Sequence, residues 1–343
     1  MTLPRIGFFG TGWIGRHRMA AMLATGAVEA VAIADASPEA AADARALAPG
    51  ATLVDGLDAM LAMDLDGVVI ATPSALHADQ SIAALNAGVA VFCQKPLGRD
   101  AAEAARVVAA ARDANRLLGV DFSYRFTSGM AAIADLIRRG ELGHVFAIDL
   151  TFHNAYGPDK PWFYDRALSG GGCVMDLGVH LVDLALWVSG FPELAGPVGA
   201  DLFAGGSPVS LKDDGGAVED YASARFRLGD TMGGGTAVRL ACSWRLQAGQ
   251  DAVIEASFYG TRGGASLRNV GGSFYDFEAT RFQGTSRAPL ASDSAQGSTD
   301  DPTDWGTRAA ADWARRLAAG ERFDPQTAGL VRVAQVLDAI YAA

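Results

Sequence analysis

One stretch of the chain places polar side chains inside an otherwise apolar segment. In residues 170–187, GGGCVMDLGVHLVDLALW, Asp176 and His180 lie four positions apart among hydrophobic residues. In a helix this spacing puts both on one face. Buried polar groups cost free energy unless they have partners. A histidine that titrates at about pH 6.5 is a natural general base, and a carboxylate can orient its ring. The pair therefore suggests proton transfer; a mutually satisfied core pair is the alternative.

A second reactive side chain, Lys95, follows the apolar run VAVFCQ at 89–94. If that run is a strand of a parallel sheet, Lys95 lies beyond its carboxyl end, where such sheets bind ligands. A charged lysine can donate a hydrogen bond to a substrate oxygen and stabilise developing negative charge. It could instead be the base, although an unperturbed lysine is mostly protonated at neutral pH. His180 and Lys95 therefore remain alternative bases.

A glycine-rich turn, GTGWIG at 10–15, follows the first apolar run and precedes a helical segment. A GxGxxG sequence in this context predicts dinucleotide binding. The first glycine permits a tight turn, the second allows backbone to approach a pyrophosphate, and the third allows close helix–strand packing. The start of the following helix offers free N–H groups to the phosphates. The cofactor-binding residues expected in this turn are Gly10, Gly12, Trp13, Ile14 and Gly15.

An acidic residue, Asp35, ends the second apolar run 20 residues beyond Gly15. In that position a carboxylate can bind the hydroxyls of the adenosine ribose. The 2′-phosphate of NADP would meet like charge there, a repulsion of about 4 kcal/mol at roughly 4 Å and an effective dielectric near 20. The next residues, 36–38, are Ala-Ser-Pro. NAD is therefore favoured over NADP, with Arg16 and Arg18 as the arginines that could reach a phosphate.

The elements that must position these residues fall into two regions. Up to about residue 122, short runs rich in Val, Ile and Phe alternate with helical segments, which predicts a parallel sheet covered on both faces. The expected strands are 5–10, 28–35, 66–72, 89–94 and 117–123.

From about residue 144 the runs alternate apolar and polar residues, which predicts an antiparallel sheet with one face buried. Polar residues 284–303 are expected to form a mobile loop, and helices return at about 304–319 and 326–341. We expect a dinucleotide-binding domain at 1–122, joined by 304–343, and a substrate domain at 123–303.

Length and composition agree with a compact two-domain protein. The chain has 343 residues, of which 50% are hydrophobic and 20% charged. The formal charge of −11 argues against a nucleic-acid surface, which needs clustered Lys and Arg. No uninterrupted apolar run reaches the roughly 18 residues that span a bilayer, and the start of the chain lacks signal-peptide character. The cysteines, Cys93, Cys173 and Cys242, are expected to be free thiols. We expect a cytoplasmic location, no membrane partner and no metal.

Taken in order, the glycine turn, ATPSALH (71–77), Lys95-Pro96 and the Asp176-x-x-x-His180 segment make the chain resemble the glucose–fructose oxidoreductase/inositol dehydrogenase/MocA (Gfo/Idh/MocA) family. The resemblance covers nearly the whole length. It implies an α/β fold, with an N-terminal Rossmann domain followed by an α+β domain that has a large open, mainly antiparallel sheet. It also implies that the last helices return to the first domain.

The resemblance further implies an NAD(H)-dependent oxidoreductase that transfers a hydride between nicotinamide and a secondary alcohol or ketone of a sugar, polyol or inositol. Lys95, Asp176 and His180 occupy the catalytic positions. Gln94 departs from the family pattern, because a neutral amide replaces the usual glutamate of the Glu-Lys-Pro motif. Two alternatives on the same fold are an NAD-dependent glycoside hydrolase and a non-catalytic sensor of NAD or sugar.

Further site residues are expected by position. The cofactor contacts expected outside the glycine turn are Asp35, Thr72, Ser74, His77, Gln94 and Lys95. The expected substrate contacts are Arg125, Tyr156, Trp162, Tyr164, Asp176 and His180. A helix cap is an alternative for His77, a salt bridge for Arg125, and packing for the aromatic residues. The open sheet favours a homodimer or homotetramer.

Overall fold

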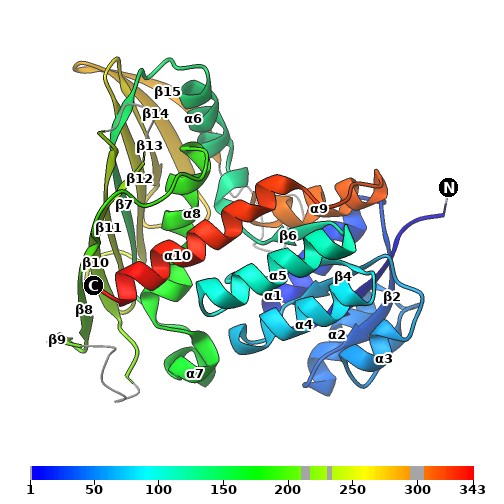
Figure 1. Ribbon diagram of the computed structural model, residues 1–343. Coiled ribbons are helices and arrows are strands. Elements are labelled where there is room, and N and C mark those ends of the chain that lie inside the picture. Colours follow the sequence, from blue (N-terminus) through cyan, green and yellow to red (C-terminus); the bar gives the residue numbers. More distant parts are fainter. Residues whose placement is uncertain (1, 210–216, 230–233, 294–304) are drawn as a thin grey trace. The chain divides into compact units, whose positions relative to one another are not determined.

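The computed structural model describes residues 2–209, 217–229, 234–293 and 305–343. These residues form two compact units (Figure 1). The first unit comprises residues 2–98, 102–123 and 305–331, and the second comprises 99–101, 124–293 and 332–343 within the described ranges.

The first unit is built on a six-stranded parallel sheet in the order β3-β2-β1-β4-β5-β6. This is the strand order of doubly wound dinucleotide-binding folds. Its strands are β1 (Arg5–Phe9), β2 (Glu29–Ala34), β3 (Thr52–Leu53), β4 (Gly67–Ile70), β5 (Ala90–Cys93) and β6 (Leu118–Val120). Its main helices are α1 (Trp13–Ala24), α2 (Pro38–Leu47), α3 (Leu57–Leu61), α4 (Ser74–Asn86), α5 (Ala101–Ala114) and α9 (Arg308–Ala318).

Helix α9 packs directly on this sheet, although it lies some two hundred residues further along the chain. The Trp313 side chain is buried, and its ring centroid lies 5.8 Å from that of Phe92 on β5. The Trp313 ring requires glycine where it meets strands β4 and β6, because a Cβ at Gly67 or Gly119 would lie 2.7 Å from an atom of that ring. Two glycines inside otherwise apolar strands are thus explained by the close approach of one tryptophan.

The second unit is built on a nine-stranded sheet in the order β15-β14-β13-β12-β7-β11-β10-β8-β9. Every pairing is antiparallel except that of β7 with β11. Its strands are β7 (Val145–Asn154), β8 (Gly199–Ala204), β9 (Ser207–Pro208), β10 (Tyr221–Leu228), β11 (Thr236–Ser243), β12 (Ala252–Gly260), β13 (Gly264–Asn269), β14 (Phe277–Gln283) and β15 (Ser286–Asp293). The predicted Rossmann domain and large, mainly antiparallel sheet are both confirmed.

Helices cover one face of the large sheet, where α6 (Ser128–Arg138) and α8 (Val179–Val188) lie side by side (Figure 1). The remaining helical elements are η1 (Ser123–Phe126), η2 (Pro161–Tyr164), α7 (Arg166–Ser169), η3 (Val174–Gly178), η4 (Trp305–Thr307), η5 (Pro325–Ala328) and α10 (Gly329–Tyr341). The helical stretch Arg166–Val188 is long and apolar enough to cross a membrane by composition, but 78% of its apolar window is buried inside the protein. Core helices meet the same criterion.

Helix α8 is preceded by a π-helical turn, η3, in which the Val179 N–H donates to the Val174 carbonyl five residues back. Asp176 lies in this turn and His180 in the first turn of α8. The sequence predicted an ordinary helical spacing for the pair, and the extra residue of the π turn changes their relative phase. Single π turns inside helices are frequently found at functional sites.

The glycines before this turn are required by close packing. Gly170 adopts a left-handed conformation with φ 87°. A Cβ at Gly171 would lie 1.9 Å from the Tyr341 hydroxyl oxygen, and one at Gly172 would lie 1.9 Å from the Glu219 carbonyl oxygen. The run of glycine therefore lets the chain pass close to two other segments.

The prediction of a mobile loop at 284–303 is wrong for its first part. Residues Ser286–Asp293 form β15, which pairs antiparallel with β14. Backbone pairing with a neighbouring strand stabilises this segment despite its polar composition, and Asp293 accepts a hydrogen bond of 2.8 Å from Ser128. Residues 294–303 lie outside the described residues.

We expect Gly172→Ala to lower the free energy of unfolding by about 1–3 kcal/mol, because the added methyl group overlaps backbone that cannot move independently. Gly50→Ala is the matched control, since a Cβ at Gly50 meets nothing within 4 Å. Urea unfolding monitored by circular dichroism measures both variants. Equal stability of the two variants would contradict the close-packing account.

Candidate active site

The glycine turn of the first unit has the geometry that a pyrophosphate requires. Gly10 has φ 84°, which favours glycine, and a Cβ at Gly15 would lie 2.0 Å from the Gly10 carbonyl oxygen. A Cβ at Gly12 meets nothing within 4 Å, so the backbone there is open. Helix α1 begins at the next residue, and its first N–H groups face the turn. The residues present therefore fit a dinucleotide, whose phosphates α1 and Gly12 would hold.

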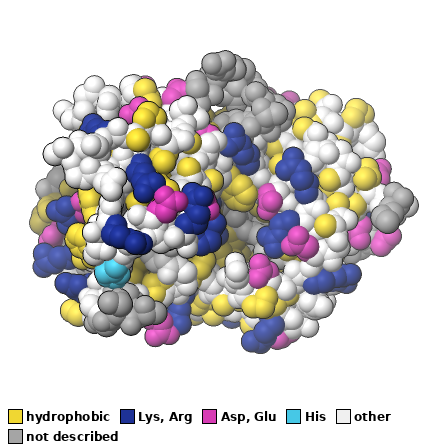
Figure 2. All heavy atoms as spheres, turned by 90° about the horizontal axis from the view of Figure 1, so that it is seen from above, with side chains coloured by type: hydrophobic (Ala, Val, Ile, Leu, Met, Phe, Trp, Pro, Cys, Tyr) yellow, Lys and Arg dark blue, Asp and Glu magenta, His cyan; other side chains and the backbone are white. Residues whose placement is uncertain are grey.

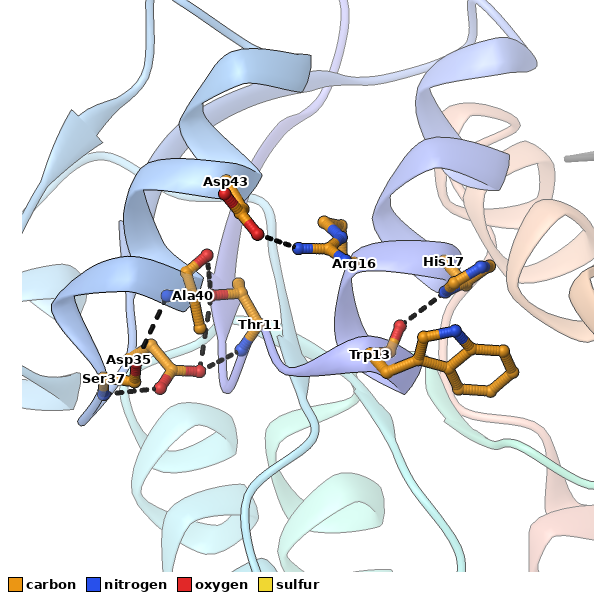
Figure 3. Close-up of polar contacts among 8 residues, drawn as sticks. All are labelled: Thr11, Trp13, Arg16, His17, Asp35, Ser37, Ala40 and Asp43. Atoms are coloured by element: carbon orange, nitrogen blue, oxygen red, sulfur yellow. Dashed lines mark hydrogen bonds and ion pairs between the residues drawn. The ribbon is translucent and has the colours of Figure 1, made fainter. Parts of the chain in front are cut away.

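Asp35 lies beyond the end of β2, beside the glycine turn (Figure 3). Its Oδ2 accepts a hydrogen bond from the Thr11 N–H at 2.5 Å, and its Oδ1 accepts one from the Ser37 N–H at 2.8 Å. Backbone on both sides thus fixes the carboxylate. A carboxylate has about four acceptor positions, so it can also accept hydrogen bonds from ribose hydroxyls.

The arginines that sequence placed near a possible NADP phosphate have other partners. Arg16 forms an ion pair with Asp43 of α2 (Figure 3). Arg18 is buried and donates from Nε to Asp121 at 2.6 Å.

The two residues after Gly12 differ in exposure. Trp13 is 50% exposed, and its ring centroid lies 4.1 Å from that of His17 (Figure 3). Ile14 is half-buried. An exposed indole at the start of α1 provides an apolar surface beside the open backbone at Gly12.

Gln94 belongs to a buried polar cluster rather than to open surface. Its Nε2 donates to Asp121 Oδ2 at 2.5 Å, and this oxygen also accepts from Arg18. The cluster therefore contains one carboxylate, one guanidinium and one neutral amide. Gln94 precedes Lys95, which is half-buried at the carboxyl end of β5. The cluster thus links α1, β5 and β6 next to the lysine.

His77 contacts the backbone around Lys95 instead of open space. Its side chain is 1% exposed, with Nδ1 2.7 Å from the Pro96 carbonyl and Nε2 2.7 Å from the Thr72 carbonyl. Burial lowers the pKa of His77, so the neutral ring donates to one of these oxygens. The ring connects the turn after β4 with the turn after β5. His77, expected in the cofactor pocket, is thus buried between two backbone carbonyls.

Thr72 and Ser74, the other predicted contacts in this turn, differ in burial. Thr72 is half-buried and donates from Oγ1 to Gln80 at 2.6 Å. Ser74 is buried at the start of α4. Both lie beyond the carboxyl end of β4, the edge of the sheet at which ligands bind.

In the second unit, aromatic side chains surround Asp176 and His180. The Trp244 indole Nε1 donates to Asp176 Oδ2 at 3.1 Å. The Tyr124 ring meets His180 edge-on, with centroids 5.0 Å apart. Burial, with Asp176 as a further cause, raises the pKa of Tyr124, so its hydroxyl stays protonated. The carboxylate and the imidazole each have a defined aromatic neighbour.

Residues 4–122 match the model of the oxidoreductase family with an NAD-binding Rossmann fold, and residues 130–266 match that of the Gfo/Idh/MocA C-terminal domain. Inositol 2-dehydrogenase of Rhizobium meliloti (strain 1021) is 32% identical over 267 residues, which are 77% of this chain and 76% of that protein.

The chain belongs to the Gfo/Idh/MocA oxidoreductase family.

Solved structures show the same fold. A levoglucosan dehydrogenase in complex with NADH and levoglucosan superposes with a TM-score of 0.81 at 23% identity, covering 99% of this chain and 96% of that one. A 3-ketoreductase from Actinomadura kijaniata in complex with NADP has a TM-score of 0.78 at 22% identity, covering 99% and 98%. Membership of an oxidoreductase family with an NAD-binding domain agrees with the glycine turn described above.

Arg125, a predicted substrate contact, forms a buried ion pair. Its Nε donates to Asp183 Oδ2 at 2.7 Å, and its guanidinium lies 5.8 Å from the Trp187 ring centroid and 5.3 Å from that of Phe191. Asp183 is 1% exposed, and burial raises its pKa although Arg125 opposes the shift. The salt bridge expected as the alternative for Arg125 is thus present.

The predicted aromatic contacts lie in different environments. The Trp162 and Phe163 rings stack with their centroids 3.8 Å apart, and the Phe163 and Tyr164 rings both meet the Trp244 ring edge-on. The Tyr164 hydroxyl donates to the Pro158 carbonyl at 2.9 Å and accepts from Arg245 at 3.0 Å. Phe163 and Tyr164 contact Trp244, and the Trp244 indole donates to Asp176, so one residue links these aromatic rings to Asp176.

Tyr156 is exposed, and its hydroxyl donates to Asp251 at 2.6 Å. Cys93, Cys173 and Cys242 are all buried. In the described parts of the chain, no cluster of His, Cys, Asp and Glu could hold a metal ion.

We expect Gln94→Glu to destabilise the protein, because a second carboxylate would then face Asp121 with Arg18 as the shared cation. Two like charges at about 4 Å repel by roughly 4 kcal/mol at an effective dielectric near 20, so a loss of about 2–4 kcal/mol is expected. The double variant Gln94→Glu, Asp121→Asn restores one carboxylate and one amide and should recover most of the loss. Urea unfolding measures both. If Gln94→Glu is as stable as the parent protein, the claim that this cluster accommodates only one carboxylate is wrong.

Proposed function

We propose that the protein is an NAD(H)-dependent oxidoreductase that transfers a hydride between nicotinamide and a secondary alcohol or ketone of a sugar, polyol or inositol. The observation that carries the proposal is the glycine turn with open backbone at Gly12, in a chain that matches both domains of this oxidoreductase family. We assign the acid–base chemistry to Lys95, Asp176 and His180. The substrate class rests on the relatives named as inositol and levoglucosan dehydrogenases.

In this mechanism each side chain has one task. Bound NAD supplies the nicotinamide carbon that exchanges hydride with the substrate. Neutral His180 takes the proton of the substrate hydroxyl. Asp176, itself held by the Trp244 indole, orients the imidazole and stabilises its protonated form. Lys95 donates a hydrogen bond to the reacting oxygen and stabilises the negative charge that develops there.

The stacked Trp162 and Phe163 rings supply a further argument for a carbohydrate or cyclitol. Aromatic faces are large apolar surfaces that can lie against the C–H groups of a ring, while nearby polar groups bind its hydroxyls. The Trp162–Phe163 pair is connected to Asp176 through the edge-on contact of Phe163 with Trp244. We assign these two rings to the substrate side of the site.

A screen of NAD reduction over D-glucose, myo-inositol and levoglucosan tests the activity, with NADH absorbance as the readout. Net NADH formation supports the dehydrogenase. Glycosides with good leaving groups are screened in parallel, and their cleavage without net NADH formation would identify the glycoside hydrolase alternative. Binding of NAD with neither reaction would identify a sensor.

We also propose assembly into a homodimer or homotetramer through the face of the large sheet opposite α8. A concave region on this face is lined by residues that alternate with buried Leu150 and Leu240, among them Thr151 and the Arg239–Asp149 ion pair. Figure 2 shows a different side of the molecule, seen from above the view of Figure 1, on which acidic and basic side chains are interspersed. Light scattering after size-exclusion chromatography measures the oligomeric state.

For cofactor choice, we expect NADH to bind at least tenfold more tightly than NADPH, a difference of about 1.4 kcal/mol. The reason is the Asp35 carboxylate, together with the ion pairs that engage Arg16 and Arg18. Asp35→Asn should narrow the difference, whereas Asp79→Asn, which removes an exposed carboxylate of the same unit, should not. Calorimetric titration of NADH and NADPH into the parent and both variants measures the six affinities. Equal affinities in the parent would disprove the role of Asp35.

For the acid–base pair, we expect His180→Ala to reduce the rate of hydride transfer by roughly 10²- to 10⁴-fold, the usual contribution of general acid–base catalysis. Asp176→Asn should lose activity to a similar order, because the imidazole is no longer oriented. The losses should be strongly non-additive in the double variant, since each change disables the same unit. Single-turnover kinetics and melting temperature are measured together. Large melting losses with near-normal hydride transfer would make the pair structural and assign the base to Lys95.

A further inference from the structure

A buried glutamate contacts the turn that carries Asp176. Glu219 is fully buried and lies just before β10. Its carboxylate accepts the Gly172 N–H, at 3.0 Å from each oxygen, and the Val174 N–H at 2.9 Å. Its main-chain carbonyl accepts the Cys173 N–H at 3.0 Å. One residue thus binds three consecutive N–H groups at the start of the turn.

The next residue, Asp220, is connected to Asp176 through Trp244. The Asp220 carbonyl accepts the Trp244 main-chain N–H at 2.7 Å. The Trp244 indole in turn donates to Asp176 Oδ2. Residues 219 and 220 therefore bind both the backbone that leads into Asp176 and the main chain of the tryptophan whose indole binds its carboxylate.

The groups around the Glu219 carboxylate are all donors. Besides the two N–H groups, the Tyr341 hydroxyl donates to Oε1 at 3.0 Å. An ionised carboxylate only accepts, so it satisfies all three, whereas a glutamine would turn an NH₂ group toward one of them. Burial raises the pKa of Glu219, while these hydrogen bonds favour its ionised form. The site is built for a carboxylate and not merely for a side chain of this size.

We propose that Glu219, with Tyr341 as its third donor, is a positioning residue for Asp176. By holding residues 172–174 and the segment that anchors Trp244, it sets where the Asp176 carboxylate lies when it orients His180. This inference rests on the proposed function, because it gives Asp176 a task in the reaction. Its structural part, the placement of Trp244 and Asp176, can be measured without any reaction.

The first experiment follows the indole N–H of Trp244 in ¹H–¹⁵N correlation spectra of the cofactor-free protein, assigned with Trp244→Phe among the six tryptophans. Glu219→Gln should move this resonance, and Tyr341→Phe should move it less in the same direction. Glu141→Gln, which removes a carboxylate of the second unit that pairs with Arg281, should leave it in place. An unmoved resonance in both test variants would overturn the proposal.

The second experiment measures single-turnover hydride transfer with the member of the substrate panel that reduces NAD. Glu219→Gln should lower the rate of transfer by between about tenfold and a hundredfold, the cost of a misplacement near 1 Å, with NADH affinity unchanged. If Glu219 acts through Asp176, the double variant Glu219→Gln, Asp176→Asn should lose no more than Asp176→Asn alone. Additive losses would overturn the positioning role.

The two proposals fail in different ways. If Asp176→Asn itself transfers hydride normally, the proposed catalytic task of Asp176 is wrong, whatever Glu219 does. If Asp176→Asn is impaired but Glu219→Gln is not, the proposed function stands and the positioning role is wrong. If Glu219→Gln fails to fold, the indole resonance and the rate of hydride transfer are measured for Tyr341→Phe instead. This variant removes only one hydroxyl and keeps the carboxylate.

Discussion

The constraint on which both units depend is that a buried charge must have a partner. Three contacts of buried charged groups described above connect segments far apart in the sequence: Arg18 with Asp121, Arg125 with Asp183, Glu219 with residues 172–174. Removing one member of such a pair leaves an uncompensated group, which typically costs about 3–5 kcal/mol. The polar groups are therefore as restrictive as the apolar core, and they determine where the reactive side chains lie.

The two units use their sheets differently. In the first unit β4 and β5 are fully buried, and the candidate site residues lie in the turns that follow the strands: Gly12 after β1, Asp35 after β2, Lys95 after β5. In the second unit the sheet forms a broad platform, and the reactive groups lie on a helix packed on one face. A turn that approaches phosphate needs backbone freedom, which the glycine turn of the first unit provides. A pair of side chains that transfers a proton needs fixed positions, which a helix packed on a sheet provides.

The sequence predicted the fold class, five of the six strands of the first sheet and the glycine turn, because these depend on local patterns: apolar runs, glycine spacing and flanking helices. Strand β3 has two residues and no pattern to detect. Strand β15 was missed because its residues are polar and its pairing partner stabilises it. The roles of Asp121, Trp244 and Glu219 were missed because they arise from contacts over long sequence separations, with no local signal. Arg125 could not be decided from sequence, since a salt bridge and a substrate contact need the same side chain.

The π-helical turn at Val174–Gly178 has a consequence for how this segment tolerates change. The hydrogen bonds of a π turn span five residues in place of four, so deleting one residue would let the turn close as a regular α-helical turn and change the direction of Asp176 relative to α8. Asp176 would then leave Trp244 even if every side chain near it were kept. Substitutions within the turn preserve this phase, but insertions and deletions do not. The relative direction of Asp176 and His180 is therefore encoded in the number of residues between Asp176 and α8 as much as in their identity.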